Sequence, residues 1–167
     1  MRKSLVLAMV VSLFAPPIAR ANDPPNPKDV RIVQACLKSR KPGSVSWDAC
    51  IESAYKPCIG PNENAKPPRD VTGCLRREKL VWDQMLNDAF RKLRDGLDDS
   101  QRTKLIDMQR SWIETRDKTC AFYYDYFEGS MANPMIASCE NREAARRAIF
   151  LMGFANDIAG WVDKKRH

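Results

Sequence analysis

Residues 74–97 have the sequence CLRREKLVWDQMLNDAFRKLRDGL, and this stretch decides the fold. Its apolar residues recur at steps of three and four, which places them along one face of an amphipathic helix. They are Trp82, Leu86, Phe90, Leu93 and Leu97. Gly96 and the DDS cluster at 98–100 end this helix, and Asp99 or Ser100 can cap the next one.

Two further helices are expected after this one. The second runs from Gln101 to about Phe127 and stops at the Gly-Ser pair 129–130. The third begins near Asn133, a capping residue followed by proline in the first helical position, and continues to about residue 159. Because the connections are short, consecutive helices should pack antiparallel. We therefore expect an all-α fold, an antiparallel three-helix bundle with a short cysteine-rich helical N-terminal extension.

The segment before the bundle is richer in proline and cysteine. Residues 22–27 (NDPPNP) are expected to form a flexible leader, because proline removes hydrogen-bond donors. A short helix is expected around 28–40, and a second helix should start at a Ser46 cap and run to Pro57. Residues 60–69 predict an exposed loop. The chain is thus divided into a signal peptide at 1–21, the leader and extension at 22–73, and a helical domain at 74–167.

The N-terminus has the three parts of a secretory signal peptide. Arg2 and Lys3 form the positive region, 5–15 is an apolar run, and small residues at Ala19 and Ala21 predict cleavage before Asn22. A retained membrane anchor would need about 20 apolar residues. The mature protein is therefore expected in the periplasm or outside the cell, with no transmembrane segment after cleavage.

The net charge bears on the partner. The full chain carries +7, and removal of Arg2, Lys3 and Arg20 leaves +4. Residues 74–139 are neutral, with eleven basic and eleven acidic side chains. Export makes nucleic acid an unexpected partner.

The six cysteines predict disulfides rather than a metal site. An even number of cysteines in an exported chain is typical of a disulfide framework. Zinc would need close cysteine pairs with histidines, and the only histidine is His167. We expect Cys120 to pair with Cys139, because the end of one helix and the start of the next come level in an antiparallel hairpin. For the other four, we favour Cys50–Cys58 with Cys36–Cys74, and the main alternative is Cys36–Cys50 with Cys58–Cys74.

No catalytic constellation is present in the sequence. A serine or cysteine nucleophile needs a base within reach, and no glycine-rich phosphate-binding motif occurs. We therefore expect no enzymatic activity, no metal and no cofactor.

Two groups of residues stand out within the helices. Trp112 and Arg116 share one face, so Trp112 is expected to fill the core and Arg116 to pair with an acid on a neighbouring helix. The second group is the aromatic run at the end of the same helix. Consecutive residues point all round a helix, so some of these rings should be exposed and form a contact patch. The candidate interface residues are Tyr123, Tyr124, Tyr126, Phe127 and Met131.

The order and spacing of several motifs resemble one known family. The motifs are Cys74-x7-Trp82-Asp83-x2-Leu86-Asn87, Gln101-Arg102-x2-Leu105, Gln109-Arg110-x-Trp112-x3-Arg116-Asp117-x2-Cys120, Gly129-Ser130-Met131 and Cys139. Over about residues 74–153 the chain resembles the LprI-type lysozyme-inhibitor N-terminal domain family. The chain departs from the pattern at Asn141-Arg142-Glu143, where the family often has Thr. The resemblance implies a bacterial, periplasmic or secreted helical protein.

Three hypotheses for function follow. The first is an exported protein-binding module that inhibits a lysozyme or binds another envelope protein. Because common lysozymes are basic, an inhibitor would need an acidic or neutral face. The second is an envelope module that contacts anionic cell-surface polymers or lipids through the basic ends of the chain, including the tail at 164–166. The third is an enzyme of unseen type, which the missing catalytic groups disfavour.

Overall fold

A computed structural model describes residues 24–164 of the chain. The predicted signal peptide at 1–21 lies outside these residues, as does most of the basic tail. The described part is helical and contains no strand, which confirms the all-α prediction. None of its helices is both apolar enough and long enough to cross a membrane.

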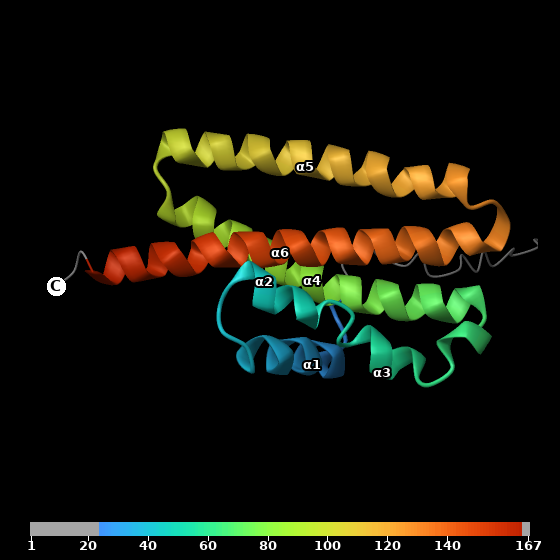
Figure 1. Cartoon of the computed structure of the whole chain (residues 1–167). Helices are drawn as coiled ribbons and strands as arrows, with labels where there is room; N and C mark the ends of the chain where they lie inside the picture. The colour runs from blue at the N-terminus through green and yellow to red at the C-terminus, as the bar shows by residue number, and fades with distance from the viewer. Residues whose placement is uncertain (1–23, 165–167) are drawn as a thin grey trace, which may run out of the picture.

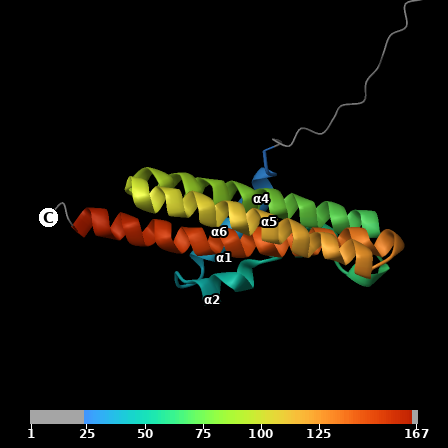
Figure 2. The same ribbon diagram turned by 90° about the horizontal axis from the view of Figure 1, so that it is seen from above.

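Three long helices form the body of the molecule (Figure 1). They are α4 (Pro68–Gly96), α5 (Asp99–Tyr126) and α6 (Ala132–Lys164), with a 3-10 turn η3 (Gly129–Met131) between the last two. The α5 helix runs antiparallel to α4 and α6, as Figures 1 and 2 show. The bundle prediction is therefore confirmed, although α4 begins at Pro68 rather than at Cys74. The proposed division between residues 73 and 74 falls inside α4, and it stays a prediction.

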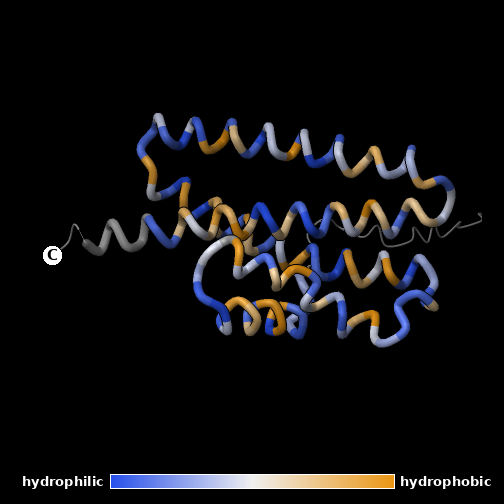
Figure 3. Tube along the Cα trace, viewed as in Figure 1, coloured by the Kyte–Doolittle hydropathy of each residue, from blue (hydrophilic) through white to orange (hydrophobic). Residues whose placement is uncertain are grey.

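The core lies mainly between α4 and α6. Val81, Trp82, Leu86, Ala89 and Leu93 of α4 are buried in it. The α6 helix contributes Ile149 and Leu151 together with small side chains at 144, 145, 148 and 155, all alanine, which let the two helices approach closely. From α5, only Leu105 belongs to this core among the described residues. Figure 3 accordingly shows α5 mostly in hydrophilic colours, with separate hydrophobic residues along it.

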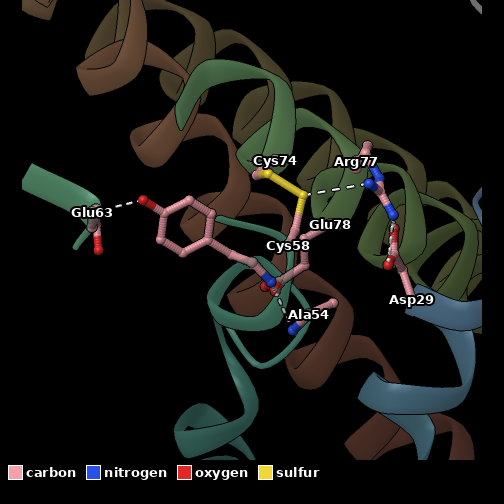
Figure 4. Close-up of a disulfide and its surroundings, with 8 residues drawn as sticks. Asp29, Ala54, Cys58, Glu63, Cys74, Arg77 and Glu78 are labelled. Atoms are coloured by element: carbon pink, nitrogen blue, oxygen red, sulfur yellow. Dashed lines mark hydrogen bonds and ion pairs between the residues drawn. A yellow bond between two sulfur atoms is a disulfide. The ribbon is translucent and has the colours of Figure 1, made fainter. Parts of the chain in front are cut away.

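The N-terminal extension packs onto the same core. It consists of α1 (Pro27–Lys38), α2 (Ser44–Trp47), a 3-10 turn η1 (Asp48–Cys50), α3 (Tyr55–Ile59) and a 3-10 turn η2 (Glu63–Ala65). Val33 and Trp47 are buried against the bundle. Asp29 of α1 forms a two-pronged ion pair with Arg77 of α4, at 2.9 to 3.1 Å (Figure 4).

The single helix predicted from Ser46 to Pro57 was wrong, because the chain breaks at Ile51 and Glu52. Ile51 is extended, and Glu52 has a φ of 72° in the left-handed region. The break brings three backbone N–H groups onto the carboxylate of Glu78, which is fully buried on α4. Its oxygens accept from Glu52 N at 2.6 Å, Ala54 N at 2.8 Å and Tyr55 N at 2.7 Å. Glu78 thus satisfies N–H groups at the start of α3 that would otherwise be buried without partners.

The three disulfides correct one of the sequence predictions. The bonds are Cys36–Cys50, Cys58–Cys74 and Cys120–Cys139. The last one is the expected pairing, but the favoured pairs Cys50–Cys58 and Cys36–Cys74 were wrong, and the alternative is formed. The break at Glu52 separates η1 from α3, so that Cys50 pairs with Cys36 of α1 and Cys58 pairs with Cys74 of α4. Figure 4 shows the second of these bonds.

Candidate functional site

The turn between α5 and α6 gathers the exposed aromatic residues of the sequence prediction. We define the turn patch by the side chains on and beside this turn: Phe122, Tyr123, Tyr124, Tyr126, Phe127 and Met131. Tyr124, Tyr126 and Met131 are 67%, 70% and 53% exposed, and Tyr123 and Phe127 are half-buried. Phe122, which is not among the predicted interface residues, is also 62% exposed.

The rings of the turn patch contact one another. Tyr123 and Phe127 stack with centroids 5.9 Å apart, and Tyr126 meets Phe127 edge to face at 5.0 Å. Phe122 lies 6.2 Å from Tyr126. Such ring pairs hold each other in place, so the patch is a connected surface rather than a set of independent side chains.

The Cys120–Cys139 disulfide closes the turn. It joins Cys120 of α5, two residues before the patch, to Cys139 of α6, eight residues after it, with Cα atoms 5.5 Å apart. Cys120 is buried, whereas its neighbours on α5 are largely exposed. The bond therefore fixes the end of a helix that has few other buried contacts, and it lowers the entropic cost of ordering the turn on binding.

A hollow of about 490 Å³ lies beside this disulfide, between α5 and α6. Its charged lining residues are Asp117, Asp125 and Glu140, and Tyr124 and Ile136 also face it. Asp117 already pairs with Arg116 at 2.6 Å. Neither Asp125 nor Glu140 makes an ion pair with any residue that the structure describes, so their charges are available to a ligand.

The sequence around the turn is acidic, a signal that summing charge over a longer stretch conceals. Residues 119–141 contain Asp125, Glu128 and Glu140 and no lysine, arginine or histidine. The neighbouring surface on α4 differs in sign, because Arg69 and Arg76 line a separate hollow together with Ser130 and Asn133. The acidic character is thus confined to the α5–α6 side of the turn.

Trp112 and Arg116 lie away from the turn and serve the packing of α5. Trp112 is half-buried at the edge of the core, so the prediction that it fills the core was wrong. It lies between two guanidinium groups, those of Arg116 at 4.9 Å and Arg147 at 5.4 Å from its ring. Arg116 pairs with Asp117 on its own helix, not with an acid on a neighbouring one.

Arg147 links α6 to α5 at this level. It donates from Nε to Oε1 of Gln109 at 2.8 Å and lies over Phe150 at 5.2 Å. Burial lowers the pKa of the Arg147 guanidinium, although arginine stays charged at ordinary pH. The interface of α5 with α6 is therefore built from polar and cation–π contacts more than from apolar packing. Trp82, in contrast, is fully buried on α4 and donates to Glu78 Oε1 at 2.9 Å.

The part of the chain that the structure covers shows no metal site. No cluster of three histidine, cysteine or acidic side chains is placed to bind a metal among residues 24–157. The expected absence of metal, cofactor and activity stays a prediction.

The fold and the turn patch define a class of protein: a small helical module, cross-linked by disulfides, that presents an aromatic and acidic surface. Three disulfides are typical of proteins that function outside the cytoplasm. A family model described as "Lysozyme inhibitor LprI" matches residues 58–151, and the chain belongs to this family. No curated protein and no solved structure matches the chain significantly.

Proposed function

We propose that this protein is exported to the periplasm or secreted, and that it binds and inhibits a lysozyme through the turn patch. The observation that carries the proposal is the acidic, aromatic turn on a chain whose net charge without residues 1–21 is +4. Membership of a family named for a lysozyme inhibitor supports it. The predicted signal peptide and the disulfides fit a protein that meets lysozyme outside the cytoplasm.

Charge complementarity favours this surface. Common lysozymes are basic, so an inhibitor should offer them a face of opposite charge. The hollow beside Cys120 and Cys139 combines the carboxylates of Asp125 and Glu140 with the ring of Tyr124. This chemistry suits a lysine or arginine side chain, which can pair with the carboxylates and lie on the ring. The surrounding rings would supply the apolar contact area of the interface.

Inhibition assays with the mature protein test the proposal. Purified protein from Asn22 onward should lower the rate at which lysozyme clears a suspension of cell walls. In a folded Tyr124→Ala/Tyr126→Ala variant, we expect the inhibition constant to rise at least about tenfold, since exposed tyrosines at an interface are each worth about 1 kcal/mol or more. The matched control is Phe150→Ala/Phe154→Ala, which removes a second exposed ring pair far along α6.

A second pair of variants tests the charge. Asp125→Asn/Glu140→Gln should weaken inhibition and reduce its dependence on salt, because exposed charges are screened at high ionic strength. Asp88→Asn/Asp95→Asn removes the same charge from α4 and should leave inhibition unchanged. If both double variants weaken inhibition to the same extent, net charge and not the position of the charges at the turn governs binding. Unchanged inhibition in the folded tyrosine variant would exclude the patch, and loss on trimming residues 164–167 would point to the basic tail instead.

A further inference from the structure

The corner segment that joins α1 to α2 is basic. Residues 30–47 contain Arg31, Lys38, Arg40 and Lys41 and no acidic residue. All four side chains are exposed. None of them has a carboxylate within 4.0 Å among the residues that the structure describes, whereas arginines elsewhere on the surface commonly pair with neighbouring acids. Their charges are therefore free to meet an external anion.

Apolar side chains accompany these charges. A hollow of about 560 Å³ opens at the corner, with Lys38 and Arg40 beside it. Its apolar lining comes from Leu37, Trp47, Met85 and Met152. No acidic residue lines it. Val45, in α2, is 89% exposed, the most exposed of the large hydrophobic side chains in the described residues.

The corner is held in a fixed shape. The Cys36–Cys50 disulfide joins α1 to η1 and encloses residues 37–49. Within that loop the Ser46 hydroxyl donates to the backbone carbonyl of Lys41. Gly43 turns the chain with a φ of 144°, a conformation that other residues rarely adopt. Val45 is thus presented by a closed loop, whose ordering costs little on binding.

We propose that this basic corner, defined as Arg31, Lys38, Arg40, Lys41 and Val45, binds the surface of an anionic membrane. Basic side chains near an anionic bilayer are attracted to its headgroups, and an exposed apolar side chain between them can enter the boundary with the acyl chains. The hollow behind Lys38 and Arg40 would receive an acyl chain next to its headgroup. An anionic polymer would use the charges but would leave Val45 and the apolar hollow without a role, so the observations favour lipid.

The position of the corner is compatible with the proposed function. It lies toward the opposite end of the molecule from the turn between α5 and α6, in both Figure 1 and Figure 2. A protein attached through the corner would therefore not need to cover the turn patch. The two surfaces can therefore act at the same time, and each can be tested without the other.

Vesicle flotation with the mature protein tests the proposal. The probes are vesicles of phosphatidylcholine alone and of phosphatidylcholine with phosphatidylglycerol at equal amounts. We expect binding to the anionic vesicles only, with loss at high salt. Lys38→Gln/Arg40→Gln/Lys41→Gln should lower the partition coefficient at least tenfold, since each basic residue near an anionic surface contributes a factor of about five. Val45→Ser, which keeps every charge, should lower it about fivefold.

The control variant removes equal charge elsewhere. Lys56→Gln/Lys66→Gln/Arg76→Gln replaces three exposed cations outside the corner and should bind within twofold of the wild type. Equal loss in both triple variants would overturn the proposal in favour of net charge. Binding to dextran sulfate that is as tight as to vesicles, together with no effect of Val45→Ser, would overturn it in favour of an anionic polymer. Lysozyme inhibition by the corner variant should be unchanged, which separates this proposal from the function of the turn patch.

Discussion

Asn141 on α6 donates its side-chain amide to Oε1 of Glu78 on α4 at 3.2 Å, and both side chains are fully buried. With the indole of Trp82 and the N–H groups of residues 52, 54 and 55, this bond brings five donors to one carboxylate. Glu78 therefore joins the N-terminal extension, α4 and α6 at a single point. A buried carboxylate is tolerated there because its lone pairs are satisfied.

Glu78→Gln should destabilise the protein by about 3 kcal/mol or more. The side-chain NH2 of glutamine would face the N–H groups that now donate to the carboxylate, so some of these buried groups would lose their acceptor. Urea unfolding followed by circular dichroism measures this change. Asp83→Asn, in the partly exposed pair with Lys79 on the same helix, is the control and should cost less than about 1 kcal/mol. A loss as small as that of the control would show that Glu78 does not organise the core.

Trp82 of α4 and Trp112 of α5 should differ in their contribution to stability. Trp82 is fully buried, so Trp82→Ala should cost about 3–5 kcal/mol. Trp112 is half-buried between two guanidinium groups, and Trp112→Ala should cost about 1–2 kcal/mol, from partial burial and two cation–π contacts. Equilibrium unfolding of both variants measures the two losses of unfolding free energy. A loss for Trp112→Ala that equals or exceeds that for Trp82→Ala would contradict the half-buried position of Trp112 on α5.

The fold class could be predicted because the three long helices have a strong local signal. Leu86 and Leu93 repeat at helical steps on α4, and the Gly and Pro residues near 129 and 134 mark the turn. The Cys120–Cys139 bond followed from the hairpin alone. These features depend on residues that are close in sequence, so they can be predicted from one sequence.

The extension could not be predicted in the same way. Its disulfide pairing depends on the break at Glu52, and that break is stabilised by Glu78, 26 residues away. A carboxylate in a helical pattern is ordinarily assigned to the solvated face, and nothing local marks Glu78 as buried. The asparagine at 141, where the family often has threonine, is likewise explained only by the structure, in which its amide donates to Glu78.

The turn patch was partly predictable. The excess of rings over one helical face indicated that some of them are exposed, and the structure shows that these are Tyr124 and Tyr126. Phe122 is exposed as well but precedes the predicted run. The acidic character of residues 119–141 was concealed by counting charge over 74–139, where basic residues earlier in α4 and α5 balance it.

Export should yield a mature protein that begins at Asn22. Mass spectrometry of material recovered from the periplasm or the medium of an expressing bacterium measures the N-terminus directly. The mass should correspond to residues 22–167 less six hydrogens for three disulfides. A stable product that retains residues 1–21 in the membrane would contradict the signal-peptide prediction.

Stability should fall at alkaline pH partly through Tyr55. This side chain is buried and donates to Glu63, and burial first, then this hydrogen bond, raises its pKa well above the usual value of 10.0. The unfolded chain loses that proton near pH 10 while the folded protein keeps it, so stability decreases as the pH rises above about 10. Tyr55→Phe should be less stable than the wild type at pH 8 by about 1 kcal/mol. The difference in melting temperature should shrink between pH 9.5 and 11.5.

Tyr124→Phe, at an exposed position, is the control for that titration and should follow the wild type at every pH. Parallel curves for the wild type and Tyr55→Phe would show that Tyr55 does not contribute to the alkaline loss.

Removal of the Cys120–Cys139 bond should loosen one end of α5 more than the rest of the molecule. The bond closes a loop of 18 intervening residues, so Cys120→Ala/Cys139→Ala should cost about 3 kcal/mol. Because α5 buries only Leu105, Gln109 and Cys120, its last turns have little else to hold them. Hydrogen exchange followed by mass spectrometry should show faster exchange at residues 113–127, while α4 retains its protection.

The same variant should inhibit lysozyme less well, since the rings of the turn patch must then be ordered on binding. Unchanged exchange at 113–127 would mean that packing alone holds the turn, and full inhibition despite faster exchange would remove rigidity from the proposed mechanism.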